Sequence, residues 1–175
     1  MNLDSICSNF NEVVQTTRDN RLLRYYAEYL VARELTKKGH NVELRKTTFS
    51  TPDLIIKDIG KTVEVKSSMI DNEYWGCGAS FGNGKSISEN KFNYSVFVVF
   101  KNYSPYKFFI FTLEELRELL NKKVGVFKNN PYALIWYETY EEYLREYPDA
   151  KDRLKLEINL HKHPEEYEDR WDRIK

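Results

Sequence analysis

The sequence has few of the features that mark secreted, zinc-binding or membrane-spanning proteins. It contains two cysteines, Cys7 and Cys77, without a CxxC pair or histidines at zinc-ligand spacing. This excludes a disulfide framework and argues against a structural zinc site. No apolar run approaches the ~20 residues that a membrane-spanning helix needs. Residues 1–9 lack the basic and apolar regions of a signal peptide, so we expect a cytoplasmic protein in a reducing compartment.

Net charge is also absent, because 27 basic side chains balance 27 acidic ones. The two signs are unevenly distributed, with 19 basic and 15 acidic residues in 1–130 against 8 basic and 12 acidic in 131–175. A polyanion-binding protein usually has a larger surplus, so nucleic-acid binding would require positive charge gathered in one cleft. The 175 residues suit one domain, with 1–130 as its core and 131–175 as an acidic extension packed on it.

Hydrophobic periodicity in the first half predicts two helices followed by three strands. Apolar residues at three- and four-residue steps indicate helices over 5–17 and 22–38, the second ending at Gly39. Alternating or β-branched runs predict strands over 41–46, 54–56 and 62–65. The glycine-rich stretch 67–93 shows no periodic pattern apart from a helix start at 86–89, so we expect a long loop there.

Further elements are predicted in the second half. The continuous apolar runs 94–100 and 106–111 are typical of strands covered on both faces. A capping box at 112–115 precedes a segment with leucines at helical spacing. In the acidic extension, alternation over 154–160 predicts a strand, and the segment 164–173 is predicted to start as a helix.

Three charged residues occupy strand positions where apolar side chains would be expected. Asp53 follows Pro52 at the start of one strand, and Glu64 and Lys66 flank Val65 in the next. Side chains two apart on a strand share a face, so Glu64 and Lys66 point together while Val65 faces the core. If the two strands pair antiparallel, Asp53 comes beside Glu64. Two carboxylates suit Mg²⁺, and the amine of Lys66 could hold or deprotonate an attacking water, which is the chemistry of phosphodiester hydrolysis.

Pro52-Asp53 followed by Glu64-Val65-Lys66 resembles the PD-(D/E)xK signature of restriction endonucleases and archaeal Holliday junction resolvases, and the likeness covers about residues 22–111. The resemblance implies an α/β fold with a restriction-endonuclease-like core (α-β-β-β-α-β), a mixed central sheet flanked by helices, and here a C-terminal α/β extension. It implies a Mg²⁺-dependent DNA endonuclease, with Mn²⁺ as a substitute, in which Asp53, Glu64 and the carbonyl of Val65 bind the ion. It further implies a homodimer acting on duplex or branched DNA.

In that family a glutamate on the preceding helix supports the site, which nominates Glu28. Glu28 interrupts the apolar stripe of its helix, where an unpaired carboxylate would be costly. The alternative is a plain ion pair with Arg24, four residues earlier. Glu34, by contrast, has Lys37 and Lys38 at helical spacing and is typical of a surface ion pair.

The glycine-rich loop that follows Lys66 is predicted to border the cleft. Ser67, Lys85 and Lys91 could contact DNA phosphates there, and Trp75 or Phe81 could stack on a base.

Two other functions stay open from the sequence. The segment 79–86 ends in Gly84-Lys85-Ser86 and fits a relaxed phosphate-binding-loop spelling, which would suit a nucleotide hydrolase. The polar, glycine-rich residues before it argue against that interpretation, because such a loop should follow a buried apolar strand. The second alternative is a non-catalytic nucleic-acid or protein-binding module that keeps the nuclease fold.

Overall fold

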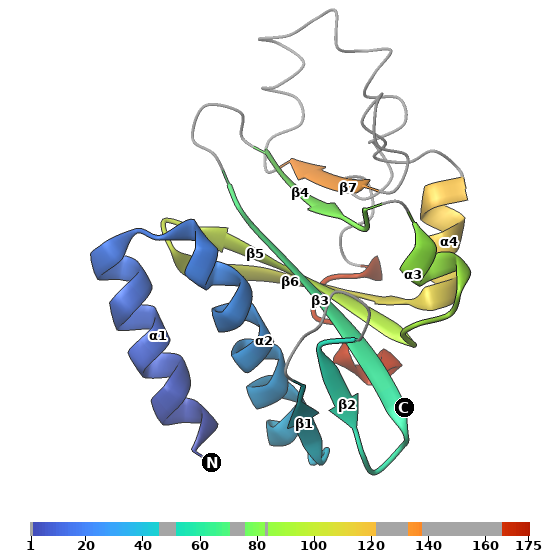
Figure 1. Ribbon diagram of the computed structural model, residues 1–175, viewed down its shortest axis with the longest axis horizontal. Helices are drawn as coiled ribbons and strands as arrows, with labels where there is room; N and C mark the ends of the chain where they lie inside the picture. Colours follow the sequence, from blue (N-terminus) through green and yellow to red (C-terminus); the bar gives the residue numbers. More distant parts are fainter. Residues whose placement is uncertain (1, 46–51, 71–75, 83, 122–132, 138–165) are drawn as a thin grey trace, which may run out of the picture.

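The computed structural model describes residues 2–45, 52–70, 76–82, 84–121, 133–137 and 166–175. Two helices precede a series of strands that is interrupted by two further α-helices (Figure 1). In chain order they are α1 (Leu3–Thr17), α2 (Asn20–Lys37), β1 (Val42–Leu44), β2 (Leu54–Ile56), β3 (Lys61–Met69), β4 (Gly76–Ser80), α3 (Lys85–Ser88), β5 (Tyr94–Lys101), β6 (Ser104–Thr112), α4 (Leu113–Asn121), β7 (Ala133–Tyr137) and η3 (Trp171–Arg173). Within these described ranges, no helix has the length and apolar character needed to span a membrane.

Five strands form the main sheet in the order β1-β2-β3-β5-β6. β3 and β5 run parallel, and the other neighbouring strands run antiparallel. The register places Leu54 of β2 opposite Val63 of β3, and Glu64 of β3 opposite Ser95 of β5. This mixed sheet flanked by helices confirms the predicted α/β fold class.

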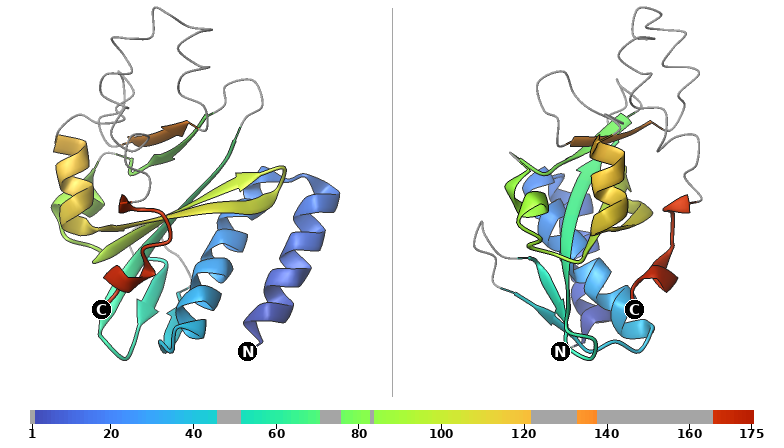
Figure 2. Two further views of the ribbon diagram at one scale, coloured as in Figure 1. Left: turned by 180° about the vertical axis from the view of Figure 1, so that it is seen from behind. Right: turned by 90° about the vertical axis from the view of Figure 1, so that its right-hand side faces the viewer.

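The sheet buries both of its faces, which explains the continuous apolar runs. Because successive side chains of a strand point to opposite faces, Val96 and Val98 of β5 join an apolar cluster with α1 and α2. Phe97 and Val99 join a second cluster with α3, α4 and β4. Figure 2 shows α1 and α2 beside each other on one side of the sheet, with α3 and α4 together on the other.

The glycine-rich stretch contains more regular structure than its composition predicted. β3 continues to Met69, beyond the predicted end at residue 65, and β4 pairs antiparallel with β7 in a separate two-stranded sheet. Cys77 lies opposite Trp136 and Ala79 opposite Leu134, and all four side chains are buried. The tertiary contact with β7 stabilises β4 where the local sequence favours a loop.

The other boundaries agree with the sequence more closely until the C-terminal segment. Thr112 and Glu115 form the predicted capping box, with Thr112 Oγ1 accepting from Glu115 N at 3.2 Å and Glu115 Oε2 accepting from Thr112 N at 2.9 Å. The predicted strand 154–160 lies outside the described residues. The predicted helix over 164–173 is wrong for its described part.

That part contains a bridge between Glu168 and Phe109 of β6 and then the short 3₁₀ helix η3. The left-handed backbone of Asp169, with φ 52°, interrupts a helix there. Trp171 then packs on Phe108 of β6 with ring centroids 5.5 Å apart. Residues 166–175 therefore lie against the main sheet.

Candidate active site

Asp53 lies at the point where β2 separates from β3. The antiparallel pairing ends at Leu54 opposite Val63, and continuing this register by one residue places Asp53 opposite Glu64. The N–H of Val65 is then beyond the reach of β2, and it donates instead to Asp53 Oδ2 at 2.8 Å. Asp53 is 3% exposed. This bond fixes one acidic side chain at the edge of β3.

Glu64 and Lys66 project from the opposite face of β3 to Val63 and Val65. The two valines are buried in the α1–α2 cluster, so the strand alternation sends the charged side chains toward the other face. Lys66 Nζ forms an ion pair with Glu64 Oε1. It also lies 5.6 Å from the centroid of the Phe81 ring. The structure thus brings the predicted amine and carboxylate into contact.

Glu28 and Arg24 approach the same point from α2, which packs against β3. Glu28 is 5% exposed, and its Oε1 accepts a hydrogen bond from Arg24 Nε at 3.1 Å. The Nη2 of the same guanidinium donates to Asp53 Oδ1 at 3.4 Å. Arg24 therefore bridges the helical glutamate and Asp53. Its spacing from Glu28 pointed to the first contact, but nothing in the sequence pointed to the second.

The electrostatic environment opposes ionisation of Glu28 and Glu64. Burial raises the pKa of Glu28 to about 7, and the charges of Asp53 and Glu64 act in the same direction against the opposing effect of Arg24. Burial also raises the pKa of Glu64, with Asp53 adding to the rise and Lys66 opposing it. The raised pKa values of Glu28 and Glu64 indicate that this region favours additional positive charge.

The donor set fits a hydrated, hard cation better than a closed metal site. Among the described residues, no three or more His, Cys, Asp or Glu side chains are arranged to hold a metal ion. Asp53 and Glu64 can supply two carboxylates, and Mg²⁺ commonly takes one or two of these and completes its shell with water and substrate phosphate. The closed four-ligand arrangement of structural zinc is not available from these residues.

Ser95 is a buried polar residue next to Glu64. It lies opposite Glu64 in the β3–β5 register and is 0% exposed. Its Oγ has no hydrogen-bond partner among the parts of the chain that the structure describes. A buried hydroxyl without a partner costs free energy. Nothing in the sequence pattern indicated Ser95.

The three residues predicted to contact nucleic acid are not brought together. Ser67 lines a pocket at the end of β3. Lys85 and Lys91 lie at α3, whose Ile87 belongs to the apolar cluster on the other face of the sheet. Both lysines face Glu89, with N–O separations of 3.5 Å from Lys85 and 3.1 Å from Lys91. The structure separates these lysines from the pocket that contains Ser67.

Comparisons with known proteins give similarity in overall structure but not in sequence. The sequence matches no protein-family model and no curated protein. Among solved structures, the fold is similar to that of a bacterial homing endonuclease, I-Ssp6803I, with 18% sequence identity and a TM-score of 0.48. The similar region covers 70% of this chain and 78% of that one.

Proposed function

We propose that the protein is a Mg²⁺-dependent DNA endonuclease that hydrolyses phosphodiester bonds through a PD-(D/E)xK site. The observation that supports this best is the position of Asp53 next to the β3 segment that carries Glu64 and Lys66. Asp53 is buried and held by the Val65 N–H, and Glu64 and Lys66 are in contact. The pKa values of Glu28 and Glu64 are both raised, and neighbouring groups with shifted pKa values are typical of a functional site.

Asp53, Glu64 and the carbonyl of Val65 would hold the metal ion, and Mn²⁺ could replace Mg²⁺ there. When bound, the ion supplies Lewis-acid polarisation of the scissile phosphate and of the attacking water.

Lys66 would orient the attacking water or accept its proton at Nζ. The amine is restrained on one side by Glu64 and lies over the Phe81 ring, which limits its side-chain freedom. Glu28 would act as a positioning residue, because it holds the Arg24 guanidinium that contacts Asp53.

The proposed substrate is duplex or branched DNA, and the proposed assembly is a homodimer. One site of this size cuts one strand, so two copies would be needed to cut both strands of a duplex. Incubation of the protein with labelled duplex, four-way-junction, flap and single-stranded DNA would show which of these it cuts.

The test of the site compares cleavage by Asp53→Asn and Lys66→Met with that of the unchanged protein in Mg²⁺. Both substitutions keep side-chain volume, and the amide oxygen of the new asparagine can still accept from the Val65 N–H, so folding should persist. We expect cleavage to fall by roughly 100-fold or more, the usual range for loss of an acid–base or metal-binding group. Lys85→Met is the matched control, because it removes an exposed lysine that pairs with Glu89 and has no ion pair with Asp53 or Glu64, so it should leave cleavage unchanged.

Cleavage at the unchanged rate by both site variants would refute the assignment. Circular dichroism of each variant would separate loss of chemistry from loss of folding. Loss of activity in Lys85→Met instead would favour the nucleotide hydrolase, which the structure supports poorly because α3 contains four residues, whereas a phosphate-binding loop opens a long helix.

One observation favours the non-catalytic module as the second candidate. Arg24 and Lys66 already contact the acidic side chains of the site, and such compensation could serve stability without a metal ion. Calorimetric titration with Mg²⁺ and Mn²⁺ separates the two possibilities. Heat of binding that disappears in Asp53→Asn supports the nuclease, and its absence together with intact DNA binding supports the module.

A further inference from the structure

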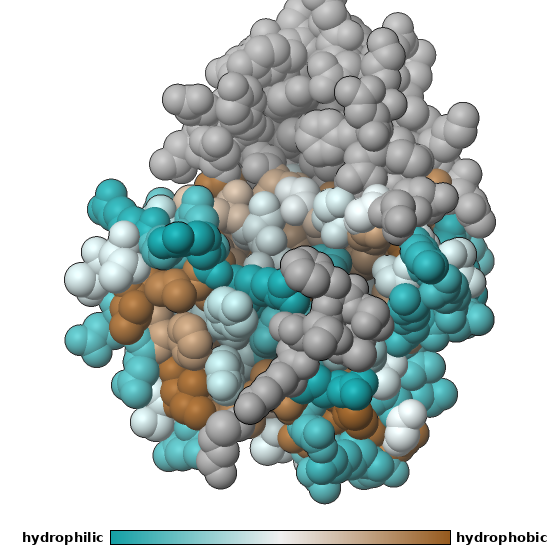
Figure 3. Space-filling model, in the orientation of Figure 1, coloured by the Kyte–Doolittle hydropathy of each residue, from teal (hydrophilic) through white to brown (hydrophobic). Residues whose placement is uncertain are grey.

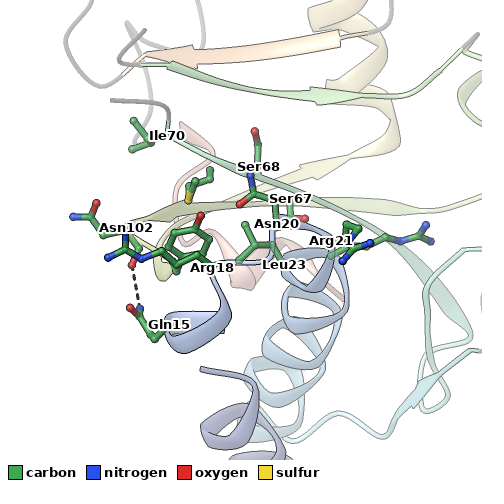
Figure 4. Close-up of a pocket in the computed structure, with 12 residues that line it drawn as sticks. Gln15, Arg18, Asn20, Arg21, Leu23, Ser67, Ser68, Ile70 and Asn102 are labelled. Atoms are coloured by element: carbon green, nitrogen blue, oxygen red, sulfur yellow. Dashed lines mark hydrogen bonds between the residues drawn. The ribbon is translucent and has the colours of Figure 1, made fainter. Parts of the chain in front are cut away.

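A pocket of about 970 Å³ lies at the end of β3, between the α1–α2 connection and the β5–β6 turn. Figure 4 shows Arg18 and Arg21 at the α1–α2 connection, near Ser67 and Ser68 of β3. Its volume lies within the range of about 300–1,000 Å³ that is usual for ligand-sized sites. The pocket is a candidate for a bound group of nucleotide size.

The lining of the pocket carries positive charge. It includes Arg18, Arg21 and Arg24 and no acidic residue among its described members. Arg21 pairs with Asp19, and Arg24 pairs with carboxylates of the proposed active site. Arg18 has no acidic partner within ion-pair distance among the residues that the structure describes. Figure 3 shows hydrophilic side chains gathered over this end of α1 and α2.

Three residues of this lining have left-handed backbone conformations, which glycine adopts most readily. Arg18 caps the end of α1 with φ 52°, a position that glycine usually occupies. Tyr103 has φ 63° and follows Asn102 with φ 51° in the turn between β5 and β6, where Asn-Gly is the preferred pair. Left-handed backbone at non-glycine residues costs free energy and gathers at functional sites. The presence of arginine at 18 and tyrosine at 103, where glycine would cost less, therefore indicates that these two side chains have a function.

The wall that carries Tyr103 is fixed in place. Gln15 Nε2 donates to the carbonyl of Asn102 at 3.1 Å and to Ser104 Oγ at 2.8 Å, which joins the end of α1 to the turn. The Tyr103 ring packs partly against the α1–α2 apolar cluster while lining the pocket. A ring held in this way needs little ordering on binding.

We propose that this pocket binds a nucleotide of the DNA strand next to the scissile bond, with a backbone phosphate at Arg18 and a base against Tyr103. Arg24 connects the two places, because it lines the pocket and also contacts Asp53 and Glu28. Ser67, also in the lining, directly follows Lys66. Arg24 is therefore the residue through which the pocket adjoins Asp53. This proposal rests on the proposed nuclease function and names where its substrate lies.

The test measures binding of a fluorescein-labelled oligonucleotide by anisotropy, with EDTA present so that no cleavage occurs. Arg18→Gly places the preferred residue at the left-handed cap, so its thermal midpoint should equal or exceed that of the unchanged protein. We expect about 10-fold weaker binding, and a slope of log affinity against log salt that falls in magnitude by about one, as loss of a phosphate contact requires. Lys38→Ala, which removes the same charge at the far end of α2, should change affinity less than twofold.

Tyr103 is tested by a pair of variants. Tyr103→Phe retains the ring and should bind like the unchanged protein, whereas Tyr103→Gly creates the favoured Asn-Gly turn and should bind about 10-fold more weakly. A parallel titration of Tyr103→Gly with urea shows whether its fold is intact, and an intact fold with unchanged DNA affinity overturns the assignment of the ring.

The outcomes separate this proposal from the nuclease itself. Unchanged DNA affinity in Arg18→Gly, with cleavage still lost in Lys66→Met, overturns the pocket and leaves the nuclease. Equal losses in Arg18→Gly and Lys38→Ala also overturn it, because they indicate general attraction. An Arg18-dependent site that binds free mononucleotide and excludes DNA overturns the assigned occupant. DNA bound through Arg18 but never cleaved, in any of the four substrate forms with Mg²⁺ or Mn²⁺, supports the pocket and overturns the nuclease.

Discussion

Replacing Glu28 by glutamine should change how stability depends on pH. The pKa of Glu28 is raised to about 7, first by burial and then by the charges of Asp53 and Glu64. A carboxyl with a raised pKa binds its proton more tightly in the folded protein than in the unfolded chain. Stability from this group is therefore present at low pH and is lost as pH rises through about 4.5 to 7. Glutamine has no such proton, so the variant should lack this loss.

The expected magnitude follows from the difference between the two pKa values. A rise from 4.5 to about 7 corresponds to roughly 3 kcal/mol between pH 4 and pH 8. Glu28 is 5% exposed, so solvent screening reduces this value little. Glutamine can still accept the hydrogen bond of Arg24 Nε. Any pH-independent effect of the substitution changes the unfolding free energy equally at pH 4 and at pH 8, so it leaves the pH-dependent difference unchanged.

The assay is urea unfolding of the unchanged protein and Glu28→Gln in EDTA at several pH values from 4 to 8. The difference in unfolding free energy between them should move in favour of the variant by roughly 3 kcal/mol across this range. Glu12→Gln, on the exposed side of α1, is the control for the substitution itself. A difference that stays constant from pH 4 to 8 would refute the electrostatic account of the buried carboxylates.

Two further substitutions test stability away from Glu28. Ser95→Ala removes a buried hydroxyl that has no partner among the described residues. The free energy of unfolding in EDTA should therefore rise by roughly 1–3 kcal/mol. A loss of stability would contradict this and would show that ordered water already satisfies the hydroxyl. Thr112→Ala removes the cap of α4 and should lower the unfolding free energy by about 1 kcal/mol, and an unchanged urea midpoint would contradict that role.

The sequence predicted most of the main sheet because its strands carry local signals. The alternation around Glu64 and Lys66 and the apolar run of β5 each follow from burial of one or both faces, so residue types alone indicate the pattern. The same alternation predicted that Glu64 and Lys66 share a face. Their contact in the structure is a direct consequence of the two-residue period of β3.

Pairings between distant segments were not predictable in the same way. β4 has a glycine-rich sequence, and its strand conformation depends on β7, more than fifty residues later in the chain. The contact of Arg24 with Asp53 joins α2 to the start of β2 and leaves no periodic trace in the sequence. Ser95 could not be predicted as a neighbour of Glu64 for a similar reason, because only the parallel register with β3 places the two residues side by side.

Arg24 connects two acidic side chains of the proposed site, a link that the sequence motif does not indicate. One guanidinium holds Glu28 through Nε and Asp53 through Nη2, while the Val65 N–H holds the other oxygen of Asp53. The Asp53 carboxylate is therefore held from α2 and from β3 at once. Since Arg24 also lines the neighbouring pocket, a DNA strand bound there would meet the carboxylates through the residue that positions them.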